Sequence, residues 1–104
     1  MVVDDLFHAL ADPTRRDIVS RTLQAEHSVS ALARLYPMSF AAVQKHVAVL
    51  HRADLVRKRA HGREQLVRGN VDAVRRAGQV LDGLDQLWRD RIDQIDALLA
   101  EQCD

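Results

Sequence analysis

The chain has 104 residues, enough for one domain, and its 47% hydrophobic and 29% charged content is that of an ordinary globular protein. A single cysteine, Cys103, excludes a disulfide or a cysteine cage for a metal within one chain. No apolar run approaches the ~20 residues that span a bilayer. The N-terminus is acidic where a secretory signal is basic. We therefore expect a cytoplasmic protein with no membrane partner.

The net charge is zero, but the charges are unevenly distributed. Residues 43–68 contain seven Lys and Arg against two acidic residues, a net charge of +5. Residues 1–42 have a net charge of −1 and residues 69–104 one of −4. A basic block of this kind in an otherwise neutral chain points to a nucleic acid partner.

The N-terminal third of the chain is predicted to be helical. A short helix is expected at about residues 3–11, and Asp12 and Pro13 then begin a second helix as its N-cap and first residue. The second helix places Ile18 and Val19 on its buried side.

Two further helices are expected at about residues 30–53. Ser30 is the predicted N-cap of the first, which turns Leu35 inward. Ser39 caps the second, which runs over about residues 40–53. A short helix, a brief break and a second helix together form a helix-turn-helix unit, whose second helix is presented outward.

Beyond Asp54 the pattern of the sequence changes from helical to extended. Leu55–Ala60 and Glu64–Arg68 are predicted strands, and Gly62 supplies the positive φ of the tight turn between them. This basic hairpin, about residues 55–68, directly follows the helix-turn-helix. That order is typical of a winged helix.

The predicted helix at residues 40–53 has two different sides. Val43, Val47 and Leu50 form a buried stripe, whereas the opposite side combines an aromatic, small residues, an amide and a cation. Such a side fits the DNA major groove, where Phe40 can contact a thymine methyl and Gln44 can pair with adenine.

The residues predicted to contact DNA come from this helix and from the hairpin. Lys45 is expected to reach guanine or phosphate, and His46 to lie at the groove edge. The full set is Ser39, Phe40, Ala41, Ala42, Gln44, Lys45, His46, Arg57, Lys58, Arg59 and Arg63. The alternative is that this surface is simply solvated, with Phe40 packed against the neighbouring helix.

Asn70 is the predicted cap of a long final helix, about residues 70–102. Its apolar residues follow a spacing close to a heptad, and the stripe is longer than so small a domain can cover. We therefore expect a homodimer that uses this helix and the first one, although the helix could also fold back on its own domain. The predicted interface residues are Leu6, Leu10, Leu81, Leu84, Trp88, Ile92, Ile95 and Leu99.

The chain resembles the ArsR-type winged-helix repressors over nearly its whole length. The resemblance lies in ALADPTRRDIV, then SALARLYPMSFAAVQKHVAVLHRADLV, RKRAHGREQLV and finally LDQLWRDRIDQIDALL. It implies a mainly α fold with a small β-hairpin wing, in one winged helix-turn-helix domain over residues 1–104. It also implies a homodimer that binds a palindromic promoter operator on double-stranded DNA, often that of its own gene, and represses transcription.

The chain departs from that family where metals are sensed. The family's sensors carry Cys-x-Cys where this chain has Ser28-Val29-Ser30, and residues 71–104 contain no His. Hydroxyls do not replace thiolates for soft metals, so we predict no metal and no cofactor. Asp54 stands where the family usually has Gly, and Tyr36 introduces a turn that usually contains Gly.

The sequence also bears on functions other than DNA-binding repression. No nucleophile motif, phosphate-binding Gly loop or paired carboxylates are found, so an enzyme is not expected. A regulator triggered by metal, through His8 and His27, or by oxidation of Cys103 is an alternative. A winged-helix protein-interaction module is another. The sequence does not identify an inducer.

Overall fold

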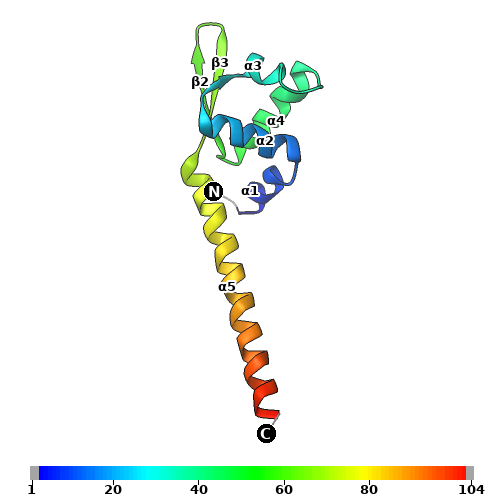
Figure 1. The fold of residues 1–104 in the computed structure, drawn as a ribbon. Helices are drawn as coiled ribbons and strands as arrows, with labels where there is room; N and C mark the ends of the chain where they lie inside the picture. The colour runs from blue at the N-terminus through cyan, green and yellow to red at the C-terminus, as the bar shows by residue number, and fades with distance from the viewer. Residues whose placement is uncertain (1–2, 103–104) are drawn as a thin grey trace. The chain divides into compact units, whose positions relative to one another are not determined.

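The structure, a computed structural model, describes residues 3–102 (Figure 1). Its internal contacts divide the chain into two units, the first ending at Val74 and the second beginning at Arg75. The elements in chain order are α1 (Val3–Leu10), α2 (Pro13–Gln24), β1 (His27–Ser28), α3 (Val29–Ala33), α4 (Phe40–Arg52), β2 (Val56–His61), β3 (Glu64–Gly69) and α5 (Val71–Gln102).

Asp12 and Arg15 fix the turn between α1 and α2. As predicted, Asp12 is the N-cap of α2, and its Oδ1 accepts a hydrogen bond from the Arg15 backbone N–H at 3.0 Å. The Arg15 side chain turns back to α1, where Nε donates to the Ala9 carbonyl at 2.7 Å and Nη2 to the His8 carbonyl at 3.2 Å. Because the last carbonyls of a helix have no partner within it, these bonds close the end of α1.

Ser28 caps α3, and the prediction that Ser30 does so is wrong. The Ser28 hydroxyl accepts a hydrogen bond from the Ala31 N–H at 3.0 Å. Leu35 therefore lies beyond the end of α3 and is 46% exposed instead of turned inward. Both serines have the chemistry of an N-cap, and the pairing of Ser28 with Leu66 in the sheet decides between them.

α4 has the expected start and the expected buried side. Ser39 is its N-cap, and the Ser39 hydroxyl accepts a hydrogen bond from the Ala42 N–H at 3.1 Å. Val43, Val47 and Leu50 are buried. α4 packs on α1, α2 and α3, so its apolar stripe is covered by three helices.

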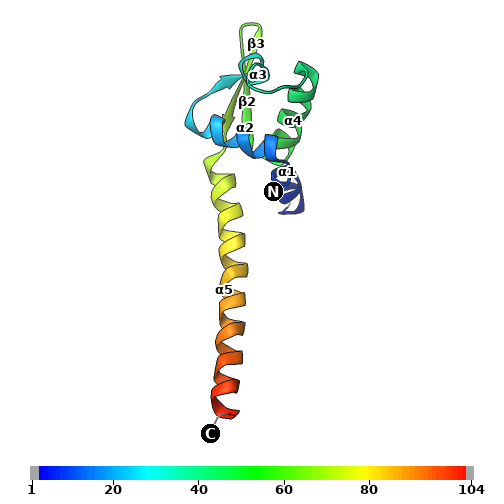
Figure 2. The same cartoon turned by 45° about the vertical axis from the view of Figure 1, so that its right-hand side comes forward.

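The sheet has three antiparallel strands in the order β1-β3-β2 (Figure 2). The hairpin of β2 and β3 was predicted, and Gly62 in its turn has a φ of 62°. β1 was not predicted, because two residues carry no recognisable strand pattern. It pairs His27 with Val67 and so attaches the hairpin to the helices.

Asp54 before the hairpin and Asn70 after it lie next to each other. Asp54 has a φ of 61°, the left-handed conformation that its short polar side chain tolerates. The Asn70 carbonyl accepts a hydrogen bond from the Val74 N–H at 3.2 Å, so α5 starts as expected. The Asn70 side-chain Nδ2 donates to the Asp54 carbonyl at 2.8 Å.

The core of the first unit gathers side chains from α1, α2, α3, α4 and the sheet. The largest fully buried apolar residues are Leu6, Ile18, Leu32, Val43, Val47, Leu50, Leu55, Val56 and Val67. Leu6 was expected at a dimer interface. Its exposure of 2% leaves it almost no surface for a partner, so it acts in the protomer core instead.

α5 beyond Arg75 forms the second unit and has a row of exposed apolar side chains. They are Leu81, Leu84, Leu87, Trp88, Ile92, Ile95, Leu98 and Leu99, with exposures from 37% to 67%. We call this set the α5 stripe. Among residues 3–102, no helix is long and apolar enough to cross a membrane.

Candidate nucleic-acid interface

The N-terminal half of α4 presents an exposed face opposite its buried stripe. Phe40 is 46% exposed, and Ala41, Gln44 and Lys45 are exposed as well. Ala41, Gln44 and Lys45 lie at i, i+3 and i+4, so they share one side of the helix. Ala42 is half-buried next to them. We call the four exposed residues, Phe40, Ala41, Gln44 and Lys45, the α4 face.

Ser39 determines where the α4 face begins. Its side chain is exposed and already accepts the Ala42 N–H. The remaining N–H groups of the first turn have no partner within the helix, and they carry the positive end of the helix dipole. This end of α4 can therefore accept a phosphate, as the sequence suggested.

His46 is placed away from the α4 face. It is half-buried, and its Nδ1 lies 3.4 Å from Nη1 of Arg15 on α2. Because Arg15 also binds the end of α1, this contact links α1, α2 and α4. His46 was expected at the groove edge, and this geometry favours a structural contact instead.

The turn before α4 is fixed by a cluster on α2. The Tyr36 hydroxyl donates a hydrogen bond to Asp17 Oδ2, and Arg21 Nε donates to the same oxygen at 2.7 Å. Burial and the bond to Asp17 raise the pKa of Tyr36 to about 12. The bonds from Tyr36 and Arg21 in turn lower the pKa of Asp17. The sequence placed Tyr36 at this turn but did not identify Asp17 as its partner.

The hairpin carries the remaining basic residues. In β2, Arg57 and Arg59 are exposed on one side of the strand and Lys58 is half-buried on the other, while Arg63 is exposed beside the turn. α3 packs against both α4 and β3, so it connects the two basic elements. In Figures 1 and 2 the hairpin projects beyond the helices of the first unit.

Arg59 differs from the other predicted contacts because it is already paired. Its Nη2 donates to Glu26 Oε1 at 2.7 Å and its Nε to Oε2 at 3.0 Å. Glu26 precedes β1 and was not singled out from the sequence. A pair separated by 33 residues leaves no local sequence signal, and only the pairing of β1 with β3 would have revealed it.

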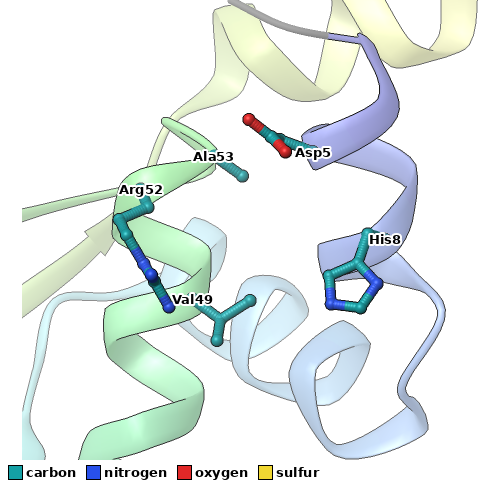
Figure 3. Close-up of a pocket in the computed structure, with 5 residues that line it drawn as sticks. All are labelled: Asp5, His8, Val49, Arg52 and Ala53. Carbon is teal, nitrogen blue, oxygen red and sulfur yellow. The ribbon is translucent and has the colours of Figure 1, made fainter.

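A cavity of about 250 Å³ lies between α1 and the C-terminal half of α4 (Figure 3). Asp5 and His8 of α1 line it on one side, and Val49, Arg52 and Ala53 of α4 line it on the other. Small-molecule sites usually measure ~300–1,000 Å³. The cavity is smaller than that range, so it gives no support for an effector site of the usual size.

Residues 3–102 contain no cluster of three His, Cys, Asp or Glu side chains that could hold a metal ion. His8 and His27, the pair considered for an unconventional site, are therefore not part of such a cluster. Cys103, the residue of the redox alternative, lies outside the described residues.

An exposed polar helix face, a capped helix N-terminus and an adjacent basic hairpin together define a winged helix-turn-helix DNA-binding domain. Comparison with known proteins agrees with this class. A family model for a helix-turn-helix domain matches residues 10–59. The HTH-type transcriptional regulator Rv2034 of Mycobacterium tuberculosis is 39% identical over 85 residues, which are 82% of this chain and 77% of that protein.

Solved structures narrow the class to a family. An ArsR-like transcriptional regulator from Rhodococcus sp. RHA1 has a TM-score of 0.80 and 29% identity, with 92% of this chain and 91% of that chain covered. The homodimeric DNA-binding domain of Mb0332 from Mycobacterium bovis, a possible ArsR-family regulator, has a TM-score of 0.67 and 27% identity, with 81% and 79% covered. The chain belongs to the ArsR family of winged helix-turn-helix transcriptional regulators. It is not an enzyme.

Proposed function

We propose that this regulator is a cytoplasmic homodimeric repressor that binds a palindromic operator, including one in its own promoter. The observation that carries the proposal is the exposed α4 face beside a basic hairpin, in a chain whose net charge is zero. A surface that served only for solvation would not need Phe40 at 46% exposure at the start of the helix. No metal or cofactor is part of the proposal.

The α4 face supplies base recognition. An α-helix fits the major groove, and its N-terminal residues meet base edges there. The Gln44 amide can form two hydrogen bonds with adenine, and Phe40 can contact a thymine methyl. Ala41 has a small side chain and allows the backbone close to the DNA. Lys45 can reach guanine or phosphate.

The hairpin supplies contacts that are independent of sequence. Arg57 and Arg63 are exposed guanidinium groups that suit phosphates or a narrow minor groove. Lys58 is half-buried and has less reach. The free side chains of this group therefore position the protein, while the α4 face selects the sequence.

The α5 stripe supports dimerisation. Eight large apolar side chains on one helix are 37% or more exposed, and such a stripe is favourable only when a partner covers it. The predicted set lacked Leu87 and Leu98, which widen the stripe. Leu10 is half-buried and keeps some surface for the partner. A two-fold dimer would present two α4 faces about one DNA turn apart, which requires a palindrome.

The first test is fluorescence anisotropy with a duplex taken from upstream of the protein's own gene, and an unrelated duplex of equal length as control. We expect tighter binding to the upstream duplex. A dimer that touches ~6–10 phosphates should lose affinity with salt at a log–log slope of about −0.9 per contact. Absence of binding to both duplexes at low salt would refute DNA binding and favour an interaction module.

Two variants separate the proposed roles. Gln44→Ala should lose discrimination at one base pair in each half of the operator, at a cost of ~1–3 kcal/mol for each of these pairs and for the preferred sequence only. Arg63→Ala should weaken binding to both duplexes alike and flatten the salt slope by about 1 for each Arg63 contact that the dimer loses. A Gln44→Ala protein with unchanged base preference would show that Gln44 does not read the operator.

A further inference from the structure

The sheet has an outer face that the proposed contacts only partly use. Residues opposite each other in the register share a face. Arg57 pairs with Arg68 and Arg59 with Leu66, whereas the buried Val67 lies on the opposite face. Arg57, Arg59 and Arg68 are all exposed, so three guanidinium groups occupy one face of two neighbouring strands. Arg68 was in the basic block but not among the predicted contacts.

Like charges placed directly across two strands oppose folding slightly. Arg57 and Arg68 are such a pair, and facing like charges are destabilising. Leu66 lies between Arg68 and the turn on the same face and is half-buried, so the arginines are grouped around one apolar side chain. An arrangement that brings cations together at a cost is expected where a polyanion is bound.

Glu26 is the acidic side chain that binds this face. It is bound at both carboxylate oxygens by Arg59, with side-chain exposures of 26% for Glu26 and 59% for Arg59. Arg59 lowers the pKa of Glu26 most strongly, and Arg68 contributes further. The Glu26 carboxylate therefore sits in the field of two of the three arginines.

A guanidinium that binds a carboxylate through two nitrogens uses the geometry with which it binds a phosphate. Glu26 and a DNA phosphate therefore compete for the same donors on Arg59. Other described arginines of this face, Arg57 and Arg68, have no ion pair within residues 3–102. Glu26 thus reduces the number of available cations from three to two.

We infer that the outer face of the sheet, Arg57, Arg59 and Arg68, is a phosphate-binding surface for duplex DNA, and that Glu26 weakens it by occupying Arg59. This inference rests on the proposed DNA binding and adds to it a further contact, Arg68, and an internal competitor, Glu26. The competitor limits sequence-independent affinity and leaves base recognition by the α4 face unchanged.

The test compares Glu26→Gln with Glu64→Gln in the anisotropy assay, using the upstream and the unrelated duplex. Glu64 is exposed, lies in β3, and has no ion pair within the part of the chain that the structure describes. Both variants remove one negative charge, so their difference isolates the release of Arg59. We expect Glu26→Gln to bind both duplexes about two- to fivefold more tightly than Glu64→Gln. Its salt slope should be steeper by about 0.9 for each Arg59 released.

Arg59→Gln provides the second comparison. In that background Glu26→Gln should bind no better than Glu64→Gln, because no guanidinium remains to be released. Glu26→Gln that binds like Glu64→Gln, or more weakly, would overturn the inference while DNA binding itself stands. Wild-type protein that binds neither duplex at low salt would overturn the proposed function, and this inference with it. Circular dichroism of each variant confirms that the fold is retained.

Discussion

α4 and α5 are both amphipathic helices, yet their apolar sides have opposite environments. Val43, Val47 and Leu50 of α4 are at most 2% exposed. The α5 stripe is 37–67% exposed. The comparison teaches that the helical period identifies an apolar side but not what covers it. In α4 the cover belongs to the same protomer, whereas in α5 the proposed dimer supplies it from a second copy.

The largest effect is expected where the apolar side is already covered. Leu50→Ala should lower the free energy of unfolding by ~2–5 kcal/mol, because it removes buried methylene groups and leaves a cavity in the core beside the C-terminal half of α4. Thermal unfolding followed by circular dichroism measures this change. Leu35→Ala is the matched control: Leu35 is 46% exposed, so its truncation should cost less than ~0.5 kcal/mol. Equal losses would mean that burial does not separate the two leucines.

The α5 stripe should respond through association instead. Trp88→Glu places a charge where the partner is expected and removes a large aromatic anchor. It should weaken the dimer by ~2 kcal/mol or more, about 30-fold in Kd, measured by sedimentation equilibrium. Gln79→Glu makes the same charge change on the opposite side of the helix and should leave the dimer intact. Trp88 is the only tryptophan, so its emission should shift to the blue as wild-type protein is concentrated. A wild-type protein that stays monomeric would show that no second copy covers the α5 stripe.

The turn before α4 gives a spectroscopic prediction. Tyr36 is the only tyrosine, so absorbance at the phenolate band reports its titration alone. The native pKa of about 12 exceeds the ordinary 10.0. A raised pKa in the folded state means that this stabilisation is complete below pH 10.0 and is lost as the pH rises toward 12. In Asp17→Asn the midpoint should fall but stay above 10.0, because burial is the larger cause. A midpoint at 10.0 in wild type would show that Tyr36 is not held against Asp17.

The smallest effect is expected at an exposed ion pair of α5. Asp85 and Arg89 form an i,i+4 ion pair at 3.1 Å with exposures of 57% and 69%. Exposed helix pairs of this kind contribute ~0.3–0.5 kcal/mol, so Asp85→Asn should change the unfolding free energy by no more than that. Urea denaturation in low and high salt measures it. A loss above ~1 kcal/mol would mean that this side of α5 is also covered.

The parts of the fold that could be predicted are those set by neighbouring residues. α4 follows from its apolar period and from Ser39, and the hairpin follows from Gly62 and its alternating strands. The mainly α fold with a hairpin wing was therefore predicted correctly. The ArsR family was predicted from the resemblance of the sequence, and its relatives confirm it. The choice between Ser28 and Ser30 as cap could not be predicted, because it depends on pairing with a distant strand.

The candidate site divides in the same way. The residues of the α4 face share one helix, so their common exposure follows from spacing. The bonds of Arg59 to Glu26 and of Arg15 to His46 connect residues 33 and 31 positions apart. Such contacts depend on the packing of whole elements, and these are the contacts that modify the predicted site.

The link between Asn70 and Asp54 has a consequence for the DNA. Asn70 donates to the Asp54 carbonyl from its side chain and to the Leu55 carbonyl from its backbone, both at 2.8 Å. The end of α4 and the first residue before α5 are thereby held together without a flexible joint. Within the first unit, these two bonds therefore connect α4 directly to the residue that follows the hairpin. In the proposed dimer, one base pair inserted between the two halves of the operator turns one half by about a tenth of a helical turn relative to the other. We expect such an operator to bind more weakly, because the two α4 faces then no longer meet their bases together.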